Sequence, residues 1–563
     1  MLAQERFGTA RFARANELKS ADLLGKDGLH HGYTFEKKPR RIGFDADTPS
    51  IILGSAGSGK LATHIAYQLL AHETTAVLDT KGELAAICAM MMPWAECYCF
   101  NPYGLWDDKP WYLPMHSINV LDIIEPHSPT MFEDALTMAS NLINKPKGGG
   151  GNSEHFHGKA VQIVTCVLVC LREHNPDASL ADVYQVIGDI RGGAEVDYFA
   201  DLHYPAMKVS SFIAVQQMAD ELFIKREKAP AEFESILSTV SNSLQCLGSP
   251  ALQRALSSPS AISVQKFCEP DTIKKLFIMM PAHLLEVCAP VIRCLFTAIT
   301  IQQQRKPLGR IHLLIDEAGQ LGHFEAMQRM FSFGRGSKCK VTAVFQNIGQ
   351  PLQHYGQEGF DTLFGNAQSK LFLGLASEKS AKYVSDYLGK ATTLFNPMLK
   401  QFTAATRRAA LTQKALSDGN LAQALPDILR EHEAMNAPDA VSRALMTPDE
   451  LIHLPSDMGI VSFHGLGVRP FKYQKIPYFQ NRDFAHRFLP NPYHAPFDKV
   501  ALPRKWRLFK KHKTVPIISE TAPAELAHLP QYAEGMWSYP KGYAPFKPKR
   551  RWRLSWLRFG KRV

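Results

Sequence analysis

The amino-acid sequence predicts an α/β protein: a parallel-sheet core with an all-helical domain inserted in it and a basic C-terminal extension. Three observations support this fold class. Short apolar runs alternate with helical patterns from Ser50 to about residue 129, and again from about residue 269. Between these stretches, residues 130–265 repeat apolar side chains with helical spacing and contain no convincing strand. Lysine and arginine are concentrated close to the C-terminus.

The core begins with an apolar strand at 51–53, a helix over 60–70, a second strand over 76–79 and a helix over 82–92. Strands that alternate with helices build βαβ units, whose strands lie parallel in one sheet. The same pattern returns after the helical region, with strands at 275–280, 311–315, 341–345, 369–373 and 459–464. The core is therefore discontinuous in sequence, and the helical region is an insertion.

These patterns predict seven segments. They are an N-terminal segment (1–45), the first part of a nucleotide-binding core (46–129), an inserted all-helical domain (130–268), the second part of the core (269–394), a polar insertion that is helical or disordered (395–442), the end of the core (443–488) and a basic C-terminal tail (489–563).

Length and composition limit the class of protein. At 563 residues the chain is long enough for two or three domains, and 45% apolar residues suffice to build their cores. Ten cysteines are scattered without a C-x-x-C pair, which indicates buried reduced thiols rather than disulfides or zinc ligands. Neither a signal peptide nor a membrane span is visible. We expect a cytoplasmic protein, and a peripheral position at the inner membrane stays open.

The net charge of +11 belongs to the C-terminal tail. Residues 504–513 and 541–563 hold many lysines and arginines and no acid, whereas the rest of the chain is net negative. Trp506, Trp552 and Trp556 stand among these cations. Aromatic rings between cations can stack on unpaired bases or lie at a lipid interface, so the tail is predicted to bind DNA or an anionic membrane surface. A solvated tail without a ligand is the alternative.

A glycine-rich turn after the first core strand predicts a phosphate-binding loop. Its residues are Gly54, Ser55, Ala56, Gly57, Ser58, Gly59, Lys60 and Leu61. In the G-x-x-x-x-G-K-[ST] loop, backbone N–H groups hold the phosphates, the lysine reaches the β- and γ-phosphates, and the next hydroxyl binds Mg²⁺. Leu61 has no hydroxyl, and Thr63 lies about 200° further round the helix. A plain strand-to-helix turn is the alternative interpretation.

A second motif, Asp316-Glu317, ends the apolar strand at 311–315. Its place far downstream of the loop is the one that a RecA-like ATPase requires. In such a site Asp316 would hold Mg²⁺, directly or through water, and Glu317 would orient and deprotonate the attacking water. Each motif is weak alone, and together they predict an ATPase that uses ATP and Mg²⁺.

Two further residues are candidates for catalysis. Gln346 ends the next core strand, where an amide can contact the γ-phosphate or the lytic water, although a glutamine bonded to backbone is nearly as good an interpretation. Arg335 stands between two glycines, as an arginine that reaches the nucleotide of a neighbouring subunit would, and an ordinary solvated arginine is the alternative. The segment 79–83 follows the second core strand and is expected at the same sheet edge as the loop.

Several segments together resemble the conjugative coupling proteins of type IV secretion systems, of the TraG type. In chain order they are Gly8–Phe12, the phosphate loop, Val77–Leu84, Phe100–Pro102, Ile315–Ala318 with Gly334–Gly336, Phe345–Asn347, Leu388–Lys390 with Thr392, and Leu445–Glu450 ahead of Leu454-Pro455. The resemblance covers most of residues 5–390 and returns at 443–485, and the order and spacing of the segments make it specific.

The resemblance implies a RecA-like ATPase with an inserted helical domain, assembled as a homo-hexameric ring. It implies DNA or a relaxase–DNA nucleoprotein and type IV secretion channel components as partners. Two departures stand out. The loop of the family commonly has glycine where this sequence has Leu61, and typical members begin with transmembrane helices, whereas this sequence starts just past where they would end. We therefore expect a form that lacks such helices.

The sequence thus leads to one functional hypothesis and two alternatives. The hypothesis is an ATP-driven coupling protein that delivers DNA or nucleoprotein to a type IV secretion or conjugation channel. The first alternative keeps the fold without the chemistry, as a hydrolysis-deficient docking platform for secretion substrates. The second is a cytosolic DNA translocase that is not linked to a channel.

Overall fold

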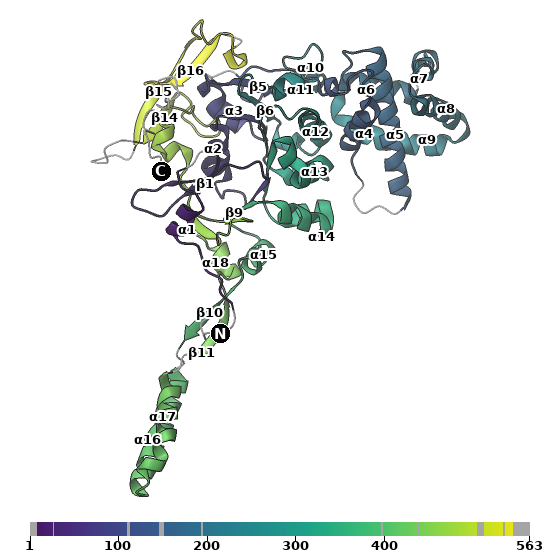
Figure 1. The fold of residues 1–563 in the computed structure, drawn as a ribbon. Helices are drawn as coiled ribbons and strands as arrows, with labels where there is room; N and C mark the ends of the chain where they lie inside the picture. The colour runs from purple at the N-terminus through teal and green to yellow at the C-terminus, as the bar shows by residue number, and fades with distance from the viewer. Residues whose placement is uncertain are drawn as a thin grey trace, which may run out of the picture.

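The structure is a computed structural model that describes residues 8–25, 28–109, 113–145, 151–192, 195–395, 398–436, 439–503, 512–532 and 535–543. Figure 1 shows a body built on a central sheet, a helical domain beside it, and an arm of two helices that projects from the body.

Eleven strands of the described chain form the central sheet. In spatial order they are β2 (Arg41–Phe44), β1 (Leu29–Tyr33), β13 (Phe471–Gln474), β12 (Met458–Phe463), β9 (Ser369–Leu373), β3 (Ser50–Gly54), β8 (Cys339–Phe345), β7 (Ile311–Ile315), β4 (Thr74–Asp79), β6 (Lys274–Met279) and β5 (Glu96–Phe100). The strands from β9 to β5 pair in parallel, and those from β12 to β2 pair antiparallel. This sheet confirms the predicted α/β class.

Helices cover both faces of the parallel strands, which explains why these strands place apolar side chains on both faces. In β3, Ile51 and Leu53 pack into the core on one face, while Ile52 packs into the core on the other. The helices of the first face are α12 (Ala289–Arg305), α13 (Glu325–Phe333), α14 (Gly349–Asn366) and α15 (Glu378–Leu388). Those of the second face are α2 (Ala66–Leu69) and α3 (Glu83–Cys88), which lie on the other side of the sheet in Figure 1.

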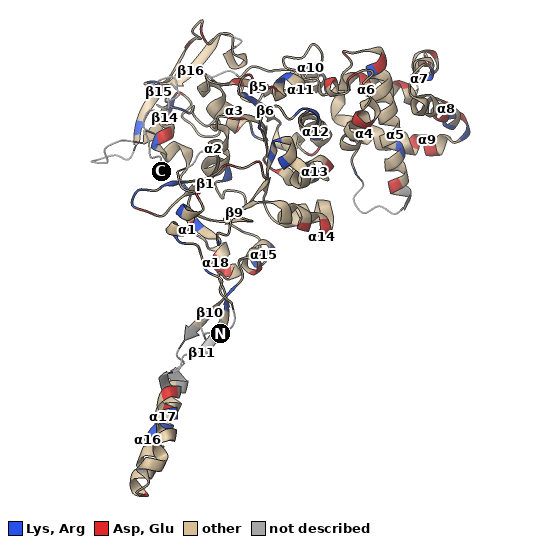
Figure 2. Cartoon of the chain, in the orientation of Figure 1, with Lys and Arg blue, Asp and Glu red and all other residues tan. Residues whose placement is uncertain are grey.

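The helical domain leaves the core after β5 and returns to it at β6. Its helices are α4 (Met131–Leu142), α5 (Gly151–His174), α6 (Leu180–Arg191), α7 (Tyr204–Lys208), α8 (Ile213–Lys228), α9 (Pro230–Leu244), α10 (Pro250–Ala255) and α11 (Val264–Cys268). Figure 2 shows acidic and basic residues interspersed along its helices, and some pair across helices, as Lys159 does with Glu221 at 2.8 Å. In the described part of the chain, no helix combines the length and the apolar run that a bilayer crossing requires.

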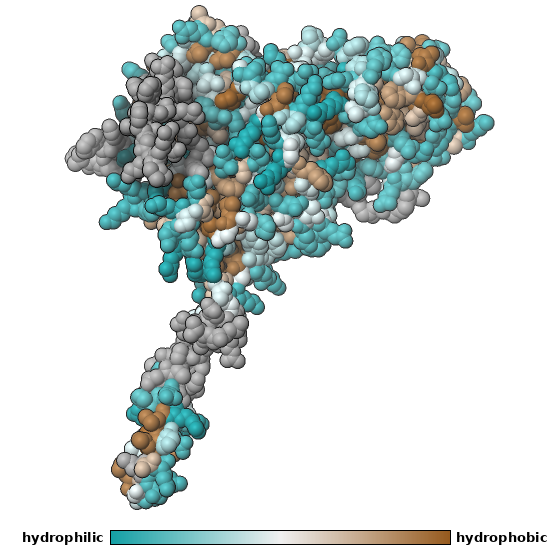
Figure 3. All heavy atoms as spheres, viewed as in Figure 1, coloured by the Kyte–Doolittle hydropathy of each residue, from teal (hydrophilic) through white to brown (hydrophobic). Residues whose placement is uncertain are grey.

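The arm occupies the segment for which the sequence left helix and disorder open. A two-stranded stem of β10 (Lys390–Phe395) and β11 (Asp439–Ala444) carries α16 (Met398–Ser417) and α17 (Leu421–Asn436). The N-terminal segment runs along this stem, where the backbone N–H of Ala10 donates to the carbonyl of Lys390 at 3.1 Å. The arm exposes apolar side chains, among them Phe402 (73% exposed) and Leu416 (67%). Figure 3 shows brown spheres, which mark hydrophobic residues, on the arm.

A second, three-stranded sheet follows the core: β14 (Lys499–Pro503), β15 (His512–Thr521) and β16 (Met536–Pro540). The sequence of this region has no regular strand period, so these strands were not predicted. Gln531 attaches this region to the edge strand β5, because its Oε1 accepts a hydrogen bond from the N–H of Cys97 at 3.0 Å and its Nε2 donates to the carbonyl of Ala95 at 2.9 Å. The basic stretches 504–511 and 544–563 lie outside the described residues.

The ten cysteines of the sequence all lie in described segments, where each is free and buried. Cys97 and Cys99 lie on β5, and Cys339 begins β8. Their burial as free thiols confirms what the cysteine spacing predicts.

Candidate functional site

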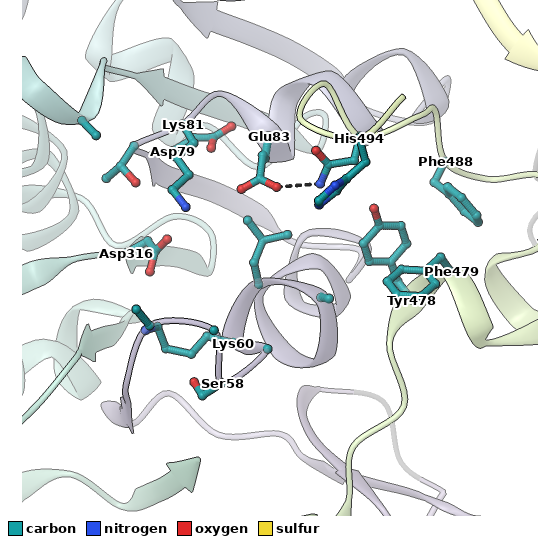
Figure 4. Close-up of a pocket in the computed structure, with 18 of the residues that line it drawn as sticks. Ser58, Lys60, Asp79, Lys81, Glu83, Asp316, Tyr478, Phe479, Phe488 and His494 are labelled. Carbon is teal, nitrogen blue, oxygen red and sulfur yellow. Dashed lines mark hydrogen bonds between the residues drawn. The ribbon is translucent and has the colours of Figure 1, made fainter. Parts of the chain in front are cut away.

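A cavity of about 920 Å³ opens at the carboxyl edge of the parallel strands (Figure 4). Residues that follow β3, β4, β7 and β8 line it, because parallel strands end at one edge of the sheet, where open α/β sheets bind ligands. Ala56 to Leu61, Asp316, Glu317 and Gln346 all contribute to the lining. The structure therefore brings together most of the site residues that the sequence predicts.

The phosphate loop has the backbone that its glycines require. Gly57 and Gly59 have φ values of +75° and +83°, which a residue with a β-carbon rarely adopts. Lys60 folds over the loop, and its Nζ donates to the carbonyls of Gly54 at 2.7 Å and Ser55 at 3.3 Å. Burial lowers the pKa of Lys60, while the charges of Glu317 and Asp316 oppose that shift. This cation at the floor of a glycine loop fits a phosphate group.

Ser58 supplies a second sign that the loop fits a ligand. Its hydroxyl is buried and has no hydrogen-bond partner among the described residues. Because buried hydroxyls are normally paired, an orphaned one beside the loop lysine suits a polar ligand atom.

Leu61 begins a short π-helical turn, Leu61–Ile65, that leads into α2. Its half-buried side chain packs against the apolar core of the second face. The hydroxyl of Thr63 donates to the carbonyl of Gly59 at 2.8 Å, so it is already engaged within the helix. Thr63 therefore does not replace the hydroxyl that Leu61 lacks.

Two aspartates end neighbouring strands beside the loop. Asp316 follows β7 and Asp79 ends β4, and these strands pair Leu78 with Ile315. Burial raises the pKa of each carboxyl to about 7, with added repulsion from Glu317 on Asp316 and from Glu83 and Asp316 on Asp79. Crowded carboxylates of this kind are stabilised by a cation, and Mg²⁺ prefers oxygen ligands. Asp316 thus fits a magnesium ion, and Asp79 fits it through Oδ1, since its Oδ2 accepts a hydrogen bond from the N–H of Ala85 at 2.9 Å.

Glu317 and Gln346 form a pair beside the aspartates. The Nε2 of Gln346 donates to Oε2 of Glu317 at 2.6 Å. Glu317 has φ 57° and ψ 42°, in the left-handed region that few residues other than glycine adopt. Such backbone strain clusters at functional sites. Because β8 lies between β3 and β7, Gln346 lies between the phosphate loop and the Asp316-Glu317 motif.

Arg335 does not line the cavity of its own chain. It lies in the turn Gly334–Ser337, just before β8, whereas Gln346 follows the other end of that strand. The seven residues of β8 separate the two ends by roughly 20 Å, at about 3.3 Å per residue. The Arg335 side chain is exposed, and it has no hydrogen-bond or ion-pair partner in the described parts of the chain.

Sequence reasoning missed one whole wall of the cavity. Tyr478, Phe479, Phe488 and Asn491 line it from the segment after β13, and Lys499 lines it from β14. These residues come from a stretch without regular period, so no strand or helix pattern placed them. The adjacent aromatic residues themselves were the available signal, since an aromatic pair just after the last core strand is suited to ligand contact.

Curated relatives match the chain over most of its length. Protein VirD4 of Rhizobium radiobacter is 23% identical over 500 residues, which cover 86% of this chain and 66% of that protein. The conjugal transfer protein TraG of Escherichia coli is 22% identical over 487 residues, covering 80% and 71% respectively. This chain thus spans just under two thirds of the length of the VirD4 protein that it matches.

Solved structures of the plasmid coupling protein TrwB share the fold. An unbound form that lacks 70 N-terminal residues aligns with a TM-score of 0.59 at 17% identity, over 84% of this chain and 94% of that one. A TrwB complex with ADP and Mg²⁺ aligns with a TM-score of 0.56 at 16% identity, over 84% and 95%.

The family described as type IV secretory system conjugative DNA transfer matches residues 11–420 and 429–496. This match covers most of the sequence, including the phosphate loop, the Asp316-Glu317 motif and the helical domain. The chain therefore belongs to the type IV secretory system conjugative DNA transfer family.

Proposed function

We propose that this protein is an ATP-driven coupling protein that delivers DNA or nucleoprotein to a type IV secretion channel. The observation that carries the proposal is the convergence of Lys60, Asp316 and Glu317 in one cavity at the carboxyl edge of the sheet. The family match and the conjugal-transfer names of the relatives support the transfer role. The TrwB complexes with ADP and Mg²⁺ and with a non-hydrolysable ATP analogue support the proposal that the ligand of this cavity is ATP.

In this proposal the residues of the cavity have separate roles. Lys60 exchanges its two carbonyl partners for the β- and γ-phosphates, and the N–H groups of the glycine loop hold the remaining phosphate oxygens. Asp316 and Asp79 hold Mg²⁺, which when bound neutralises charge on the phosphates. Glu317, oriented by Gln346, accepts a proton from the attacking water.

We further propose that the protein works as a homo-hexameric ring with nucleotide at the subunit interfaces. Arg335 supports this part, because it is exposed, unpaired within the described chain and remote from its own cavity. An arginine supplied by a neighbouring subunit stabilises the charge of the transition state.

A second candidate function, a docking platform that binds nucleotide without hydrolysing it, is favoured by one observation. Leu61 stands where Mg²⁺ usually finds a hydroxyl, and the hydroxyl of Thr63 is bonded to a backbone carbonyl. The magnesium would then depend on aspartates, water and phosphates alone.

The two functions are separated by the ATPase rate of the purified protein with and without single-stranded DNA. The coupling function predicts turnover that DNA stimulates and that Lys60→Ala abolishes. Binding of ATP without any turnover would select the docking platform. If the wild-type protein does not bind ATP, or if Lys60→Ala binds it unchanged, both functions are wrong.

A further inference from the structure

The cavity has two chemically different ends. The residues around the phosphate loop are charged, with Lys60 and Asp316 at their centre. The opposite end carries the rings of Tyr478, Phe479 and Phe488 on the other side of the loop helix (Figure 4), and the polar side chains of Asn491, His494 and Lys499 also line this wall. Phosphates and Mg²⁺ account for the charged end only. A nucleotide joins a charged chain to a flat aromatic base, so the two ends match its two halves.

The aromatic end is rigid before any ligand arrives. Tyr478 and Phe488 are buried, and their rings meet edge to face with centroids 5.1 Å apart. Phe479 packs edge to face on Tyr478 at 5.4 Å and is 39% exposed. A ring held by a buried neighbour and open at the cavity can stack on a base without a loss of its own freedom.

The segment that carries these aromatic rings is fixed to the charged end. The side-chain amide of Asn491 donates to the carboxylate of Glu83 at 2.6 Å, a contact drawn in Figure 4. Two residues further on, the ring of Tyr493 meets that of Trp106 at 4.8 Å. The indole Nε1 of Trp106 donates to the carbonyl of Lys81 at 2.8 Å. The spacing between the two ends of the cavity is thereby set by the fold.

The wall of the aromatic end includes residues beyond the region that matches the family. Val500 and Ala501 of β14 line the cavity, whereas the family match ends at residue 496. β14 pairs with β15, and the adjoining Gln531 is bonded to the edge of the central sheet. One wall of this cavity is thus formed by a strand, β14, that the family match does not include.

We propose that the aromatic end of the cavity, with Phe479 as the stacking ring and β14 as part of the wall, binds the base of the nucleotide. The inference rests on the proposed function, because it presumes that the phosphate loop holds the phosphates. It adds a base subsite and assigns part of that subsite to the C-terminal sheet.

The test compares a ligand that has a base with one that has none. The affinities of ATP and of inorganic tripolyphosphate are measured by calorimetry on the full-length protein, both with Mg²⁺. Stacking of a base on an aromatic ring changes affinity by roughly 5- to 150-fold. Phe479→Ala is therefore expected to lower the affinity for ATP at least about fivefold and to leave the affinity for tripolyphosphate unchanged. Phe479→Trp should keep the affinity for ATP.

A second variant probes the wall. Ala501→Asp puts a negative charge in the β14 wall of the aromatic end. It is expected to lower the affinity for ATP without changing the affinity for tripolyphosphate. Phe402→Ala and Ala409→Asp, on the arm, are the matched controls, and both should bind the two ligands as the wild type does.

The outcomes separate the base subsite from the proposed function. If both Phe479→Ala and Ala501→Asp bind ATP with wild-type affinity, or if the affinities for ATP and tripolyphosphate fall equally, the base does not bind at this end. If the wild-type protein binds neither ligand, or if Lys60→Ala binds both unchanged, the phosphate site fails and this inference falls with it.

Discussion

The side-chain amide of Gln346 donates a 2.6 Å hydrogen bond to the carboxylate of Glu317, across the ends of the neighbouring strands β8 and β7. The bond engages Oε2 of Glu317. In the described structure the glutamate is thus oriented by a residue of the strand that lies next to the phosphate-loop strand.

The first prediction follows from this pair. Glu317→Gln keeps the size of the side chain and removes the base, so the ATPase rate should fall by about 10²- to 10⁴-fold with ATP affinity retained. Gln346→Ala frees the glutamate and should give a smaller loss of rate, again with little change in affinity. Gln357→Ala, an exposed glutamine on α14, is the control. Equal loss of affinity and rate in Glu317→Gln would contradict the role of this residue.

The second prediction concerns Leu61. Leu61→Thr restores a hydroxyl where Mg²⁺ is usually bound, so half-maximal ATPase activity should require less Mg²⁺. Leu61→Ala removes the same bulk without adding a ligand, and it should not lower the Mg²⁺ requirement. A magnesium titration of the three proteins checks this, and identical curves would show that residue 61 does not reach the metal.

The third prediction concerns Arg335. Arg335→Ala should abolish turnover while ATP affinity stays within a few-fold, because an arginine from a neighbour mainly stabilises transition-state charge. Mixing Arg335→Ala with Glu317→Gln protein should restore part of the activity, since some interfaces then combine an intact arginine with an intact glutamate. The matched control is Arg329→Ala on α13, a surface arginine paired with Glu325. No recovery on mixing, in assembled rings, would argue against action between subunits.

The fourth prediction concerns a buried ion pair at the opposite edge of the sheet. Glu73 lies 2.5 Å from Nζ of Lys340 and 3.4 Å from Nδ1 of His312. Burial alone would raise the pKa of Glu73, but the nearby His312 ring and the charge of Lys340 hold it well below its usual value. Glu73→Gln leaves Lys340 buried and unpaired, which should lower the free energy of unfolding by about 3–5 kcal/mol at pH 7.

The pH dependence of this effect has a definite sign. A carboxyl whose pKa is lower in the folded state stabilises the protein above its unfolded pKa of about 4.3, and this stabilisation is lost as the pH falls towards the folded value. The difference between wild type and Glu73→Gln in denaturant unfolding should therefore shrink below about pH 4. Glu325→Gln, which breaks an exposed pair, should cost less than about 1 kcal/mol at any pH.

The fifth prediction concerns the basic tail. Removal of residues 544–563 leaves the three-stranded sheet in place and takes away eight of the sixteen lysines and arginines of the tail, together with Phe546, Trp552, Trp556 and Phe559. Binding to single-stranded DNA or to anionic vesicles should weaken, and its dependence on salt should flatten, because fewer counterions are released. Unchanged binding to both at every salt concentration would show that the tail is not the ligand-binding segment.

The parallel core was predictable because local pattern and tertiary position agree there. A strand such as 311–315 has apolar side chains on both faces since helices cover both of them, and the acids that follow it must then lie at the carboxyl edge. The antiparallel strands were harder. β1 reads Leu-His-His-Gly-Tyr and is nevertheless fully buried, because His30 stacks on Tyr67 with ring centroids 4.1 Å apart. Only tertiary contacts make such a polar strand part of a core.

The aromatic end of the cavity was unpredictable for a related reason. Tyr478 and Phe479 follow the last core strand in a stretch without helical or strand period. The segment that carries them is held by contacts of Asn491 with Glu83 and of Tyr493 with Trp106, partners that are hundreds of residues apart in sequence. No local pattern encodes such a contact. The position of Arg335 relative to the cavity likewise depends on the length and direction of β8 rather than on its own surroundings in sequence.

The burial of all ten cysteines has a practical consequence for measuring how this protein works. A cysteine engineered at an exposed position would be the accessible thiol in the native chain, so a fluorophore could be attached there selectively without removing the natural cysteines. One label on α6 of the helical domain and one on α16 of the arm would report, by energy transfer, any movement of these two parts during ATP turnover. The same thiol chemistry would let pairs of subunits be cross-linked at chosen points, which would measure the geometry of the assembly directly.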